Sequence, residues 1–188
     1  MDYWANVDAV DWFVRSVFPA IRAQLPEVEF HIVGARPTLE VRALTTLPGV
    51  MVAGSVPDVR PYLAHASLAV APLRIARGIQ NKVLEAMAME KIVIASPQAV
   101  EGICAIHGQE LLVANDESDF AHQIITLFRN GPSHNLARAA RARVLKDYSW
   151  EKNLGRIDAL FIQPQVIATD DGSHNLETRF QSLGDDVA

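Results

Sequence analysis

Residues 68–95 read LAVAPLRIARGIQNKVLEAMAMEKIVIA, and this stretch decides the fold. Two short apolar runs, residues 68–71 and 92–95, have the length and composition of strands that are buried on both faces. Between them lie a turn that Gly78 relaxes and a helical pattern over about residues 80–89. A strand, a helix and a second strand at this spacing predict a βαβ unit with parallel strands and a right-handed crossover.

The same alternation continues on both sides of this unit. Apolar runs at residues 30–33, 50–53 and 111–113 predict three more strands. We therefore predict an α/β fold with a Rossmann-like, doubly wound parallel sheet over residues 1–164, followed by a weakly periodic tail over residues 165–188. Further helices are predicted at residues 6–25 (with a kink at Pro19), 38–44, 59–64 (capped by Asp58), 117–129, 134–146 and 150–162.

The composition excludes several classes of protein. Of the 188 residues, 49% are hydrophobic and 21% are charged, a balance typical of a chain with a real core rather than a disordered one. The net charge of −5 argues against a broad nucleic-acid-binding surface. No signal peptide or transmembrane run is apparent, and the histidines show no spacing typical of metal ligands. Peripheral contact with the inner face of a membrane stays open.

The chain has a single cysteine, Cys104. One cysteine cannot form a disulfide within the chain, which fits the reducing cytoplasm. No activating base is evident beside it, so we interpret Cys104 as a small buried apolar residue rather than a nucleophile. Trp12 and Trp150 occupy apolar helix positions and are predicted to lie in the core.

Candidate functional residues gather between a strand end and the helix near residue 80. Arg74 and Arg77 follow the strand, Gly78 relaxes the turn, and Lys82 lies in the first helical turn. A helix N-terminus with cations beside it favours a diphosphate. Glu85 lies one turn further along the helix and can accept hydrogen bonds from ribose hydroxyls. The competing interpretation is that Lys82 and Glu85 form a solvated surface pair.

Other strand ends offer weaker candidates. The turn that contains Gly54 and Val56 could read a nucleobase through its backbone, or serve only as a strand-to-helix connection. Arg36 could face the same cleft or solvate a loop, and Ser96 could touch substrate. A basic run on one helix is interpreted as a solvated face, with an anionic membrane surface as the alternative; it comprises Arg138, Arg141, Arg143 and Lys146.

The span from about residue 1 to 161 resembles the C-terminal, donor-binding half of the GT-B glycosyltransferases of group 1, or family 4. The matching stretches are IVGARP, VMVAGSVPDVRPYLAHASLAVAPL and GIQNKVLEAMAMEKIVIASPQAVEGI. The wording RGIQNKVLEAMA is most similar to exopolysaccharide-type sugar transferases. This resemblance implies retaining, metal-independent transfer from a nucleotide-diphosphate sugar, with Lys82 on the diphosphate and Glu85 on the ribose.

The sequence departs from that family in two ways. Many relatives carry an acidic residue eight positions before the helix glutamate, where this chain has Arg77, so the donor sugar stays open. The acceptor-binding N-terminal domain and the first strand of the donor domain are expected before Met1. In a sheet ordered 3-2-1-4-5-6 that strand is central, so a gap and self-association of the chain are expected without it.

The sequence is compatible with three functions. The chain is the donor domain of a glycosyltransferase, inactive without its acceptor domain, or it is a GT-B-like sugar-nucleotide epimerase. The third is a non-catalytic nucleotide-binding module or an orphan fragment without turnover. The sequence specifies neither the nucleobase, nor the acceptor, nor the linkage.

Overall fold

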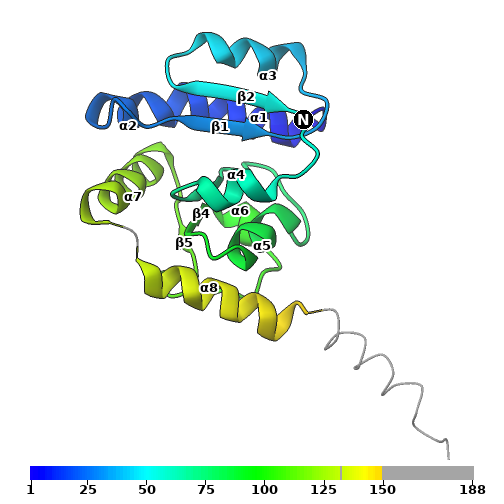
Figure 1. Cartoon of the computed structure of the whole chain (residues 1–188), viewed down its shortest axis with the longest axis vertical. Coiled ribbons are helices and arrows are strands. Elements are labelled where there is room, and N and C mark those ends of the chain that lie inside the picture. The colour runs from blue at the N-terminus through cyan, green and yellow to red at the C-terminus, as the bar shows by residue number, and fades with distance from the viewer. Residues whose placement is uncertain (132, 150–188) are drawn as a thin grey trace, which may run out of the picture.

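The computed structural model describes residues 1–131 and 133–149, and Figure 1 shows how their elements are arranged. The strands are β1 Phe30–Val33, β2 Val50–Gly54, β3 Ala69–Ala71, β4 Val93–Ala95 and β5 Leu112–Val113. The helices are α1 Trp4–Trp12, α2 Phe18–Gln24, α3 Leu39–Ala43, α4 Arg60–His65, α5 Asn81–Ala88, α6 Pro97–Val100, α7 Glu117–Asn130 and α8 His134–Asp147. A π-helical turn, Phe13–Val17, and a 3₁₀ turn, Leu44–Thr46, complete the set.

All five predicted strands are present, each within one residue of its predicted limits. Their pairing is parallel throughout, as the alternation of strands and helices predicts. The short helix α6 was not predicted; Ser96 caps it by accepting a hydrogen bond from the Ala99 N–H at 3.2 Å. The predicted helix at 150–162, the tail at 165–188, the domain limit at residue 164 and Trp150 lie outside the described residues.

The first helical segment is predicted as one helix and is interrupted in its middle. A π-helical turn over Phe13–Val17 separates α1 from α2, and Pro19 lies in the first turn of α2. Proline has no N–H to donate to the preceding turn, and its ring crowds the carbonyl there. A wider π turn just before the proline relieves both conflicts, so the predicted kink takes this form.

The parallel strands form two sheets instead of one. One sheet has the order β1-β2 and the other the order β3-β4-β5. A single doubly wound sheet ordered 3-2-1-4-5-6 would place exactly one further strand between β1 and β3. The break between β1 and β3 among the described residues lies where the gap is expected, and the order of the strands agrees with the expected topology.

Backbone groups on the two inner edges have no strand partner among the described residues. The N–H groups of Phe30 and Gly34 donate to β2 and its preceding loop, so the alternate residue, His31, points its N–H and C=O to the other side. In the same way the Ala69 N–H donates to the Ile92 carbonyl, which turns the polar groups of Val70 away from β4. Both sheets thus end in an open edge.

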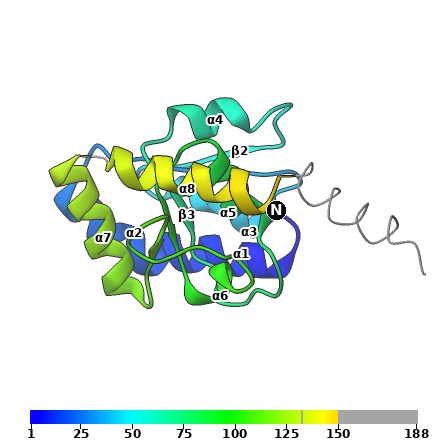
Figure 2. The ribbon, with the colours of Figure 1, turned by 90° about the horizontal axis from the view of Figure 1, so that it is seen from below.

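Helix α1 joins the two halves of the molecule because it contributes to both apolar clusters. Its Val7 and Val10 pack with β1, β2, α3 and α7, while Ala9 packs with β3, β4 and α5. Phe13 lies at the centre of the first cluster, with ring centroids 4.7 Å from Phe30 and 6.1 Å from Phe120. Seen from below, α8 runs across the second half of the molecule (Figure 2).

Three expectations about individual side chains need correction. Cys104 is exposed rather than buried, because it lies in the loop after α6, where its N–H donates to the Tyr148 hydroxyl at 2.7 Å. Asp58 accepts from the Arg60 N–H at 2.9 Å, but it precedes the N-cap residue of α4 by one position. Arg143 is not on a solvated face: it is half-buried beside Glu110.

The burial of Arg143 follows from helix geometry. It lies three positions after Ala140, a buried residue of α8, and so falls on the same face of the helix. There it forms ion pairs with Glu110 and Asp147, both at 2.8 Å. Arg138 is exposed, as expected. None of the helices in the described part of the chain combines the length and apolar character that crossing a bilayer requires.

Candidate functional site

The turn before α5 presents unpaired backbone donors. Gly78 has φ +68°, a backbone conformation that favours glycine, and a Cβ at this position would meet nothing within 4 Å. The Gln80 side-chain amide donates to the carbonyls of Arg77 and Gly78 at 3.1 and 3.2 Å. Because Gln80 braces the turn instead of capping the helix, the N–H groups of Asn81 and Lys82 have no acceptor among the described residues. Such donors are suited to an anion.

Lys82 is anchored on α1. Its ammonium Nζ donates to Asn6 Oδ1 at 2.6 Å. The residue as a whole is exposed, but partial burial of the ammonium lowers the pKa of Lys82, and the charge of Glu85 opposes that shift. Since Asn6 is neutral, the positive charge of Lys82 is not cancelled by its hydrogen-bond partner and remains available to a ligand.

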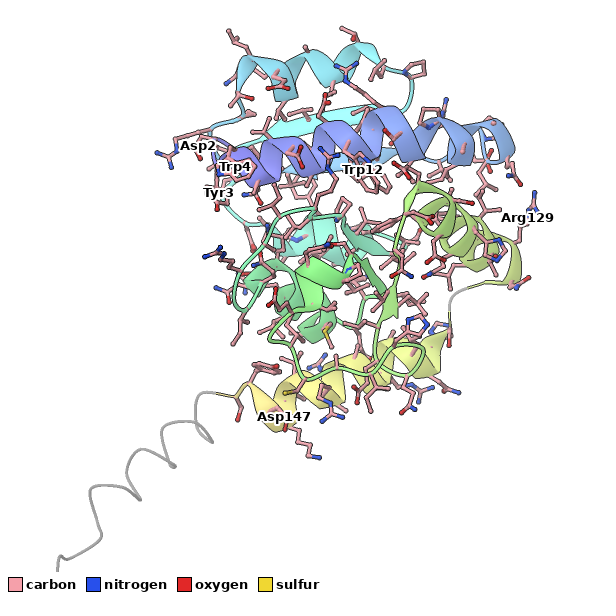
Figure 3. All side chains as sticks on the ribbon, turned by 180° about the vertical axis from the view of Figure 1, so that it is seen from behind. Asp2, Tyr3, Trp4, Trp12, Arg129 and Asp147 are labelled. Carbon is pink, nitrogen blue, oxygen red and sulfur yellow. The ribbon has the colours of Figure 1, made fainter. Side chains whose placement is uncertain are left out.

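Arg74 is anchored on the same helix by a charged partner. Its guanidinium forms a two-pronged ion pair with Asp8, in which Nε lies 3.0 Å from Oδ2. The hydrogen bond to Asp8 raises the pKa of Arg74. The guanidinium carbon also lies 5.9 Å from the centre of the Trp12 ring. Trp12, labelled on α1 in Figure 3, is half-buried rather than fully in the core.

The two anchored cations lie on opposite flanks of α1. Asn6 and Asp8 are two positions apart on this helix, which separates their directions by about 200°. The small buried residues Ala5 and Ala9 lie on the face between them, so the segment that carries Arg74 and Lys82 can approach closely. Arg74 and Lys82 are thus held by α1 in different directions. The Asp8 pair uses Nε and one terminal nitrogen of Arg74, which leaves the other terminal nitrogen for a ligand.

Arg77 and Glu85 flank the same turn and are free to bind a ligand. Both side chains are exposed, and neither makes a hydrogen bond or ion pair with another described residue. Glu85 lies one turn along α5 from Lys82, as the spacing predicts, and is near enough to act on the pKa of Lys82. Lys82 and Glu85 form no direct ion pair among the described residues, so the competing interpretation of a paired surface finds no support.

A second group of predicted residues lies at the ends of β1 and β2. The Gly34 N–H donates to the Gly54 carbonyl at 3.0 Å, and Gly54 has φ +71°. Arg36 also has a positive φ, 52°, and its exposed guanidinium lies 3.0 Å from a carboxylate oxygen of Asp2. Val56 is half-buried in the following turn. No hydrogen bond or ion pair among the described residues joins this group directly to the turn before α5.

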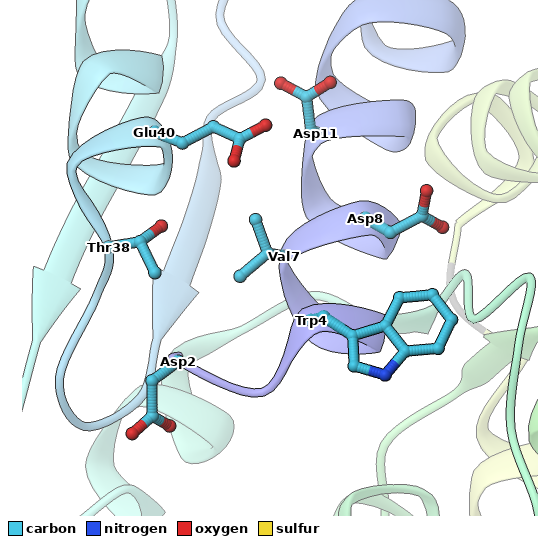
Figure 4. A pocket seen from close by; sticks show the side chains of 7 residues that line it. All are labelled: Asp2, Trp4, Val7, Asp8, Asp11, Thr38 and Glu40. Atoms are coloured by element: carbon cyan, nitrogen blue, oxygen red, sulfur yellow. The ribbon is translucent and has the colours of Figure 1, made fainter.

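One hollow in the described surface has the wrong charge for a phosphate. It measures about 350 Å³ and lies between α1 and α3. Figure 4 shows carboxylates around its rim. An anion placed there would be repelled, and the described carboxylates form no group able to ligate a metal. The residues that line it are Asp2, Trp4, Val7, Asp8, Asp11, Thr38 and Glu40.

A second hollow, of about 290 Å³, lies beyond the ends of β3 and β4. Arg74 and Trp12 line it on one side and the first turn of α7 on the other. Ser96 also lines it, but this side chain is buried, and its hydroxyl donates to the Leu73 carbonyl at 2.5 Å. Ser96 thus links the ends of β3 and β4 and caps α6, so its position has a structural explanation that involves no substrate.

Sequence reasoning missed Asn6, Asp8 and Gly102. Asn6 and Asp8 hold the two cations, yet they lie 76 and 66 residues away from them in the chain. Small residues between polar ones, as around Ala5 and Ala9, indicate that this face of the helix packs closely against another element. They do not indicate which element that is. Gly102 lies against the turn: a Cβ there would be 3.7 Å from the Gly78 carbonyl carbon.

Comparison with known proteins identifies the family. The sequence model described as "Glycosyl transferases group 1" matches residues 1–130. The chain belongs to this family. The resemblance to group 1 glycosyltransferases is thereby confirmed. A curated relative, an uncharacterized 44.6 kDa protein in the cps region of Klebsiella pneumoniae, is 24% identical over 133 residues, which make up 66% of this chain and 34% of the relative.

Solved glycosyltransferase structures share the fold. Anabaena HepE in complex with UDP and glucose matches with a TM-score of 0.66 and 16% identity, over 79% of this chain and 44% of HepE. A mutant of TarM from S. aureus, in a complex that contains UDP, matches with a TM-score of 0.66 and 20% identity, over 81% of this chain and 32% of TarM. Sucrose-phosphate synthase from Thermosynechococcus elongatus matches with a TM-score of 0.61 and 20% identity, over 78% of this chain and 42% of the synthase. The chain thus spans about a third of its curated relative and under half of these structures.

Proposed function

We propose that this group 1 glycosyltransferase chain binds the diphosphate of a nucleotide-sugar donor at the turn before α5. The observation that carries the proposal is the pair of unpaired N–H groups, on Asn81 and Lys82, beside an ammonium whose hydrogen-bond partner is neutral. Backbone donors and a cation at a helix N-terminus are a general solution for binding phosphate. UDP is present in the HepE and TarM complexes, which share the fold.

The proposed chemistry is transfer of the sugar from the diphosphate to an acceptor. An acceptor hydroxyl oxygen forms a bond to the anomeric carbon and gives its proton to the departing diphosphate, while the bond between the anomeric carbon and the diphosphate oxygen breaks. Negative charge develops on the diphosphate as that bond breaks. The ammonium of Lys82 and the two N–H groups stabilise that charge, which requires no metal. Arg77 reaches the same diphosphate from the turn, and Arg74 does so through the terminal nitrogen that Asp8 does not contact. Retention of configuration at the anomeric carbon rests on the family resemblance.

The nucleoside is proposed to extend from this turn towards the neighbouring strand ends. Glu85 lies one turn along α5 and accepts hydrogen bonds from the ribose hydroxyls. The backbone around Gly54 and Val56 lies at the end of β2 and contacts the base, with Arg36 at the rim. These assignments rest on the shared location of parallel strand ends at one edge of a sheet. The epimerase and the non-catalytic module have no described feature that favours them.

A second domain is proposed to cover the donor site. Four large apolar side chains beside the site are between 47% and 60% exposed: Tyr3, Trp4, Ile75 and Ile79. Apolar side chains gathered near a polar site are typical of a surface that another body covers. The acceptor-binding domain of a two-domain glycosyltransferase would be such a partner. We also propose that the protein is cytoplasmic and contacts the inner face of the membrane peripherally.

A calorimetric panel of nucleotide sugars tests the proposed function. We expect the chain to bind at least one member of a set of UDP-, GDP- and ADP-sugars, and to bind the corresponding nucleoside diphosphate at the same site. The nucleoside without phosphates should bind far more weakly, because the N–H groups and Lys82 contact the diphosphate. Binding of none of these ligands would overturn the proposed donor site.

The 188 residues alone are expected to bind a donor without transferring its sugar. Transfer requires donor and acceptor to be held in one reactive geometry, and the chain spans under half of the solved structures it resembles. The measurement is release of nucleoside diphosphate and formation of a glycosylated product by the purified chain with a panel of acceptors. Product formed in proportion to the chain, after removal of host enzymes, would contradict this expectation.

A further inference from the structure

The way Lys82 is held has a consequence for the donor site that rests on the proposed function. Lys82 projects from the first turn of α5, and the only described side chain that accepts a hydrogen bond from its ammonium is Asn6 on α1. Asn6 is half-buried, since it borders the face of α1 that packs against this part of the molecule. Its position is fixed by the helix, while a free lysine side chain has about four rotatable bonds.

We propose that Asn6 is the positioning residue for Lys82, which it holds at the anion-binding turn without cancelling its charge. A carboxylate at this place would pair with the ammonium and compete with the diphosphate. An amide oxygen orders the ammonium by one hydrogen bond and leaves its full charge to the ligand.

Arg74 provides a contrast within the same structure. It is held by α1 two residues further on, but by the carboxylate of Asp8. Part of its hydrogen-bonding capacity is thus already used by a carboxylate that would repel a diphosphate, although one terminal nitrogen of the guanidinium has no hydrogen-bond partner among the described residues. The two cations therefore differ in their surroundings: Lys82 has a neutral partner and Arg74 an anionic one.

The ionic surroundings of Lys82 support this assignment. Partial burial lowers the pKa of its ammonium, and Glu85 on α5 opposes the shift. The charged side chains of α1 are Asp8 and Asp11, and those of the segment before α5 are Arg74 and Arg77. On α8, which packs against α5, Arg141 pairs with Glu90 and Arg143 with Glu110. Asn6 thus supplies an uncharged contact among groups that are mostly charged.

A double-mutant cycle tests the role of Asn6. The dissociation constant for UDP is measured by calorimetry for the chain, Asn6→Ala, Lys82→Ala and the double variant, with Asn135→Ala on the exposed face of α8 as the matched control. We expect Asn6→Ala to weaken binding about three- to tenfold, as loss of one ordering hydrogen bond would. In the Lys82→Ala background the same change should have no effect, because the side chain that Asn6 positions is gone.

Asn6→Asp provides the second variant. It should fold as the chain does, raise the pKa of Lys82 measured by NMR of its side chain, and weaken UDP binding more than Asn6→Ala. A loss of affinity in Lys82→Ala, without a loss in Asn6→Ala or with an equal loss in both backgrounds, overturns the role of Asn6 alone. An unchanged affinity in Lys82→Ala overturns the proposed donor site, and this role with it.

Discussion

Lys82→Ala is expected to weaken binding of UDP to the chain by roughly 1.5–3 kcal/mol, the effect of losing one charge-assisted hydrogen bond. This is about a 10- to 150-fold rise in the dissociation constant. Glu85→Ala should weaken UDP binding through the ribose instead. Both effects are measured by isothermal titration calorimetry at constant ionic strength, because phosphate binding by a lysine is sensitive to salt.

The two losses can be separated by the choice of ligand. Dideoxy-UDP, which lacks both ribose hydroxyls, should bind the chain about as weakly as UDP binds Glu85→Ala, and Glu85→Ala should not distinguish the two ligands. Lys82→Ala should still distinguish them. Arg138→Ala and Glu27→Ala remove exposed charges elsewhere and serve as matched controls. Unchanged dissociation constants in both site variants would remove this site from consideration.

A strand that fills the space between β1 and β3 is expected to stabilise the chain. The inner edges present backbone groups of His31 and Val33 on one side and of Leu68 and Val70 on the other, without a strand partner among the described residues. About four new hydrogen bonds at roughly 0.5–1.5 kcal/mol each would raise the free energy of unfolding by about 2–6 kcal/mol. Open edges also favour pairing between molecules, so self-association should decrease.

This expectation is tested by fusing an apolar strand and a short loop to the amino end of the chain. Met1 lies beside the end of β1, with its carbonyl 3.3 Å from the Thr38 N–H, so a strand in the gap could run parallel to β1 and connect to it. Urea melts and light scattering after size exclusion compare the two chains. A fused strand with proline at alternate positions is the control. Equal stability, with both chains strictly monomeric, would contradict the placement of the gap.

Most of the fold could be predicted from local signals in the sequence. The strands at 30–33, 50–53 and 68–71 are apolar runs that a glycine or proline ends, and such runs have few alternatives. Pro19 predicted a kink but not its form as a π-helical turn. The exposure of Cys104 could not be predicted, because it lies in a loop whose position depends on contacts with residues far along the chain, such as Tyr148. The division of the sheet could be predicted from the expected strand order. The backbone groups that face the gap could be identified only from the register of the paired strands.

The sequence predicted the part of the candidate site that lies in the turn before α5, but not the part that lies on α1. The residue types around Gly78 and Lys82 indicated an anion site because backbone donors and cations occur together in one short segment. The partners on α1, Asn6 and Asp8, could not be predicted, since a helical pattern shows which face is polar and not what it contacts. The anchoring of Arg74 by Asp8 and of Lys82 by Asn6 likewise depends on contacts far apart in the chain.

Mapping UDP onto the isotope-labelled chain by amide chemical shifts tests the central claim most directly. The account predicts saturable shifts that are largest for the N–H groups of residues 78–85, above all those of Asn81 and Lys82, and small shifts around the acidic hollow between α1 and α3. Shifts centred on that hollow, or no saturable shift at millimolar UDP, would contradict the account.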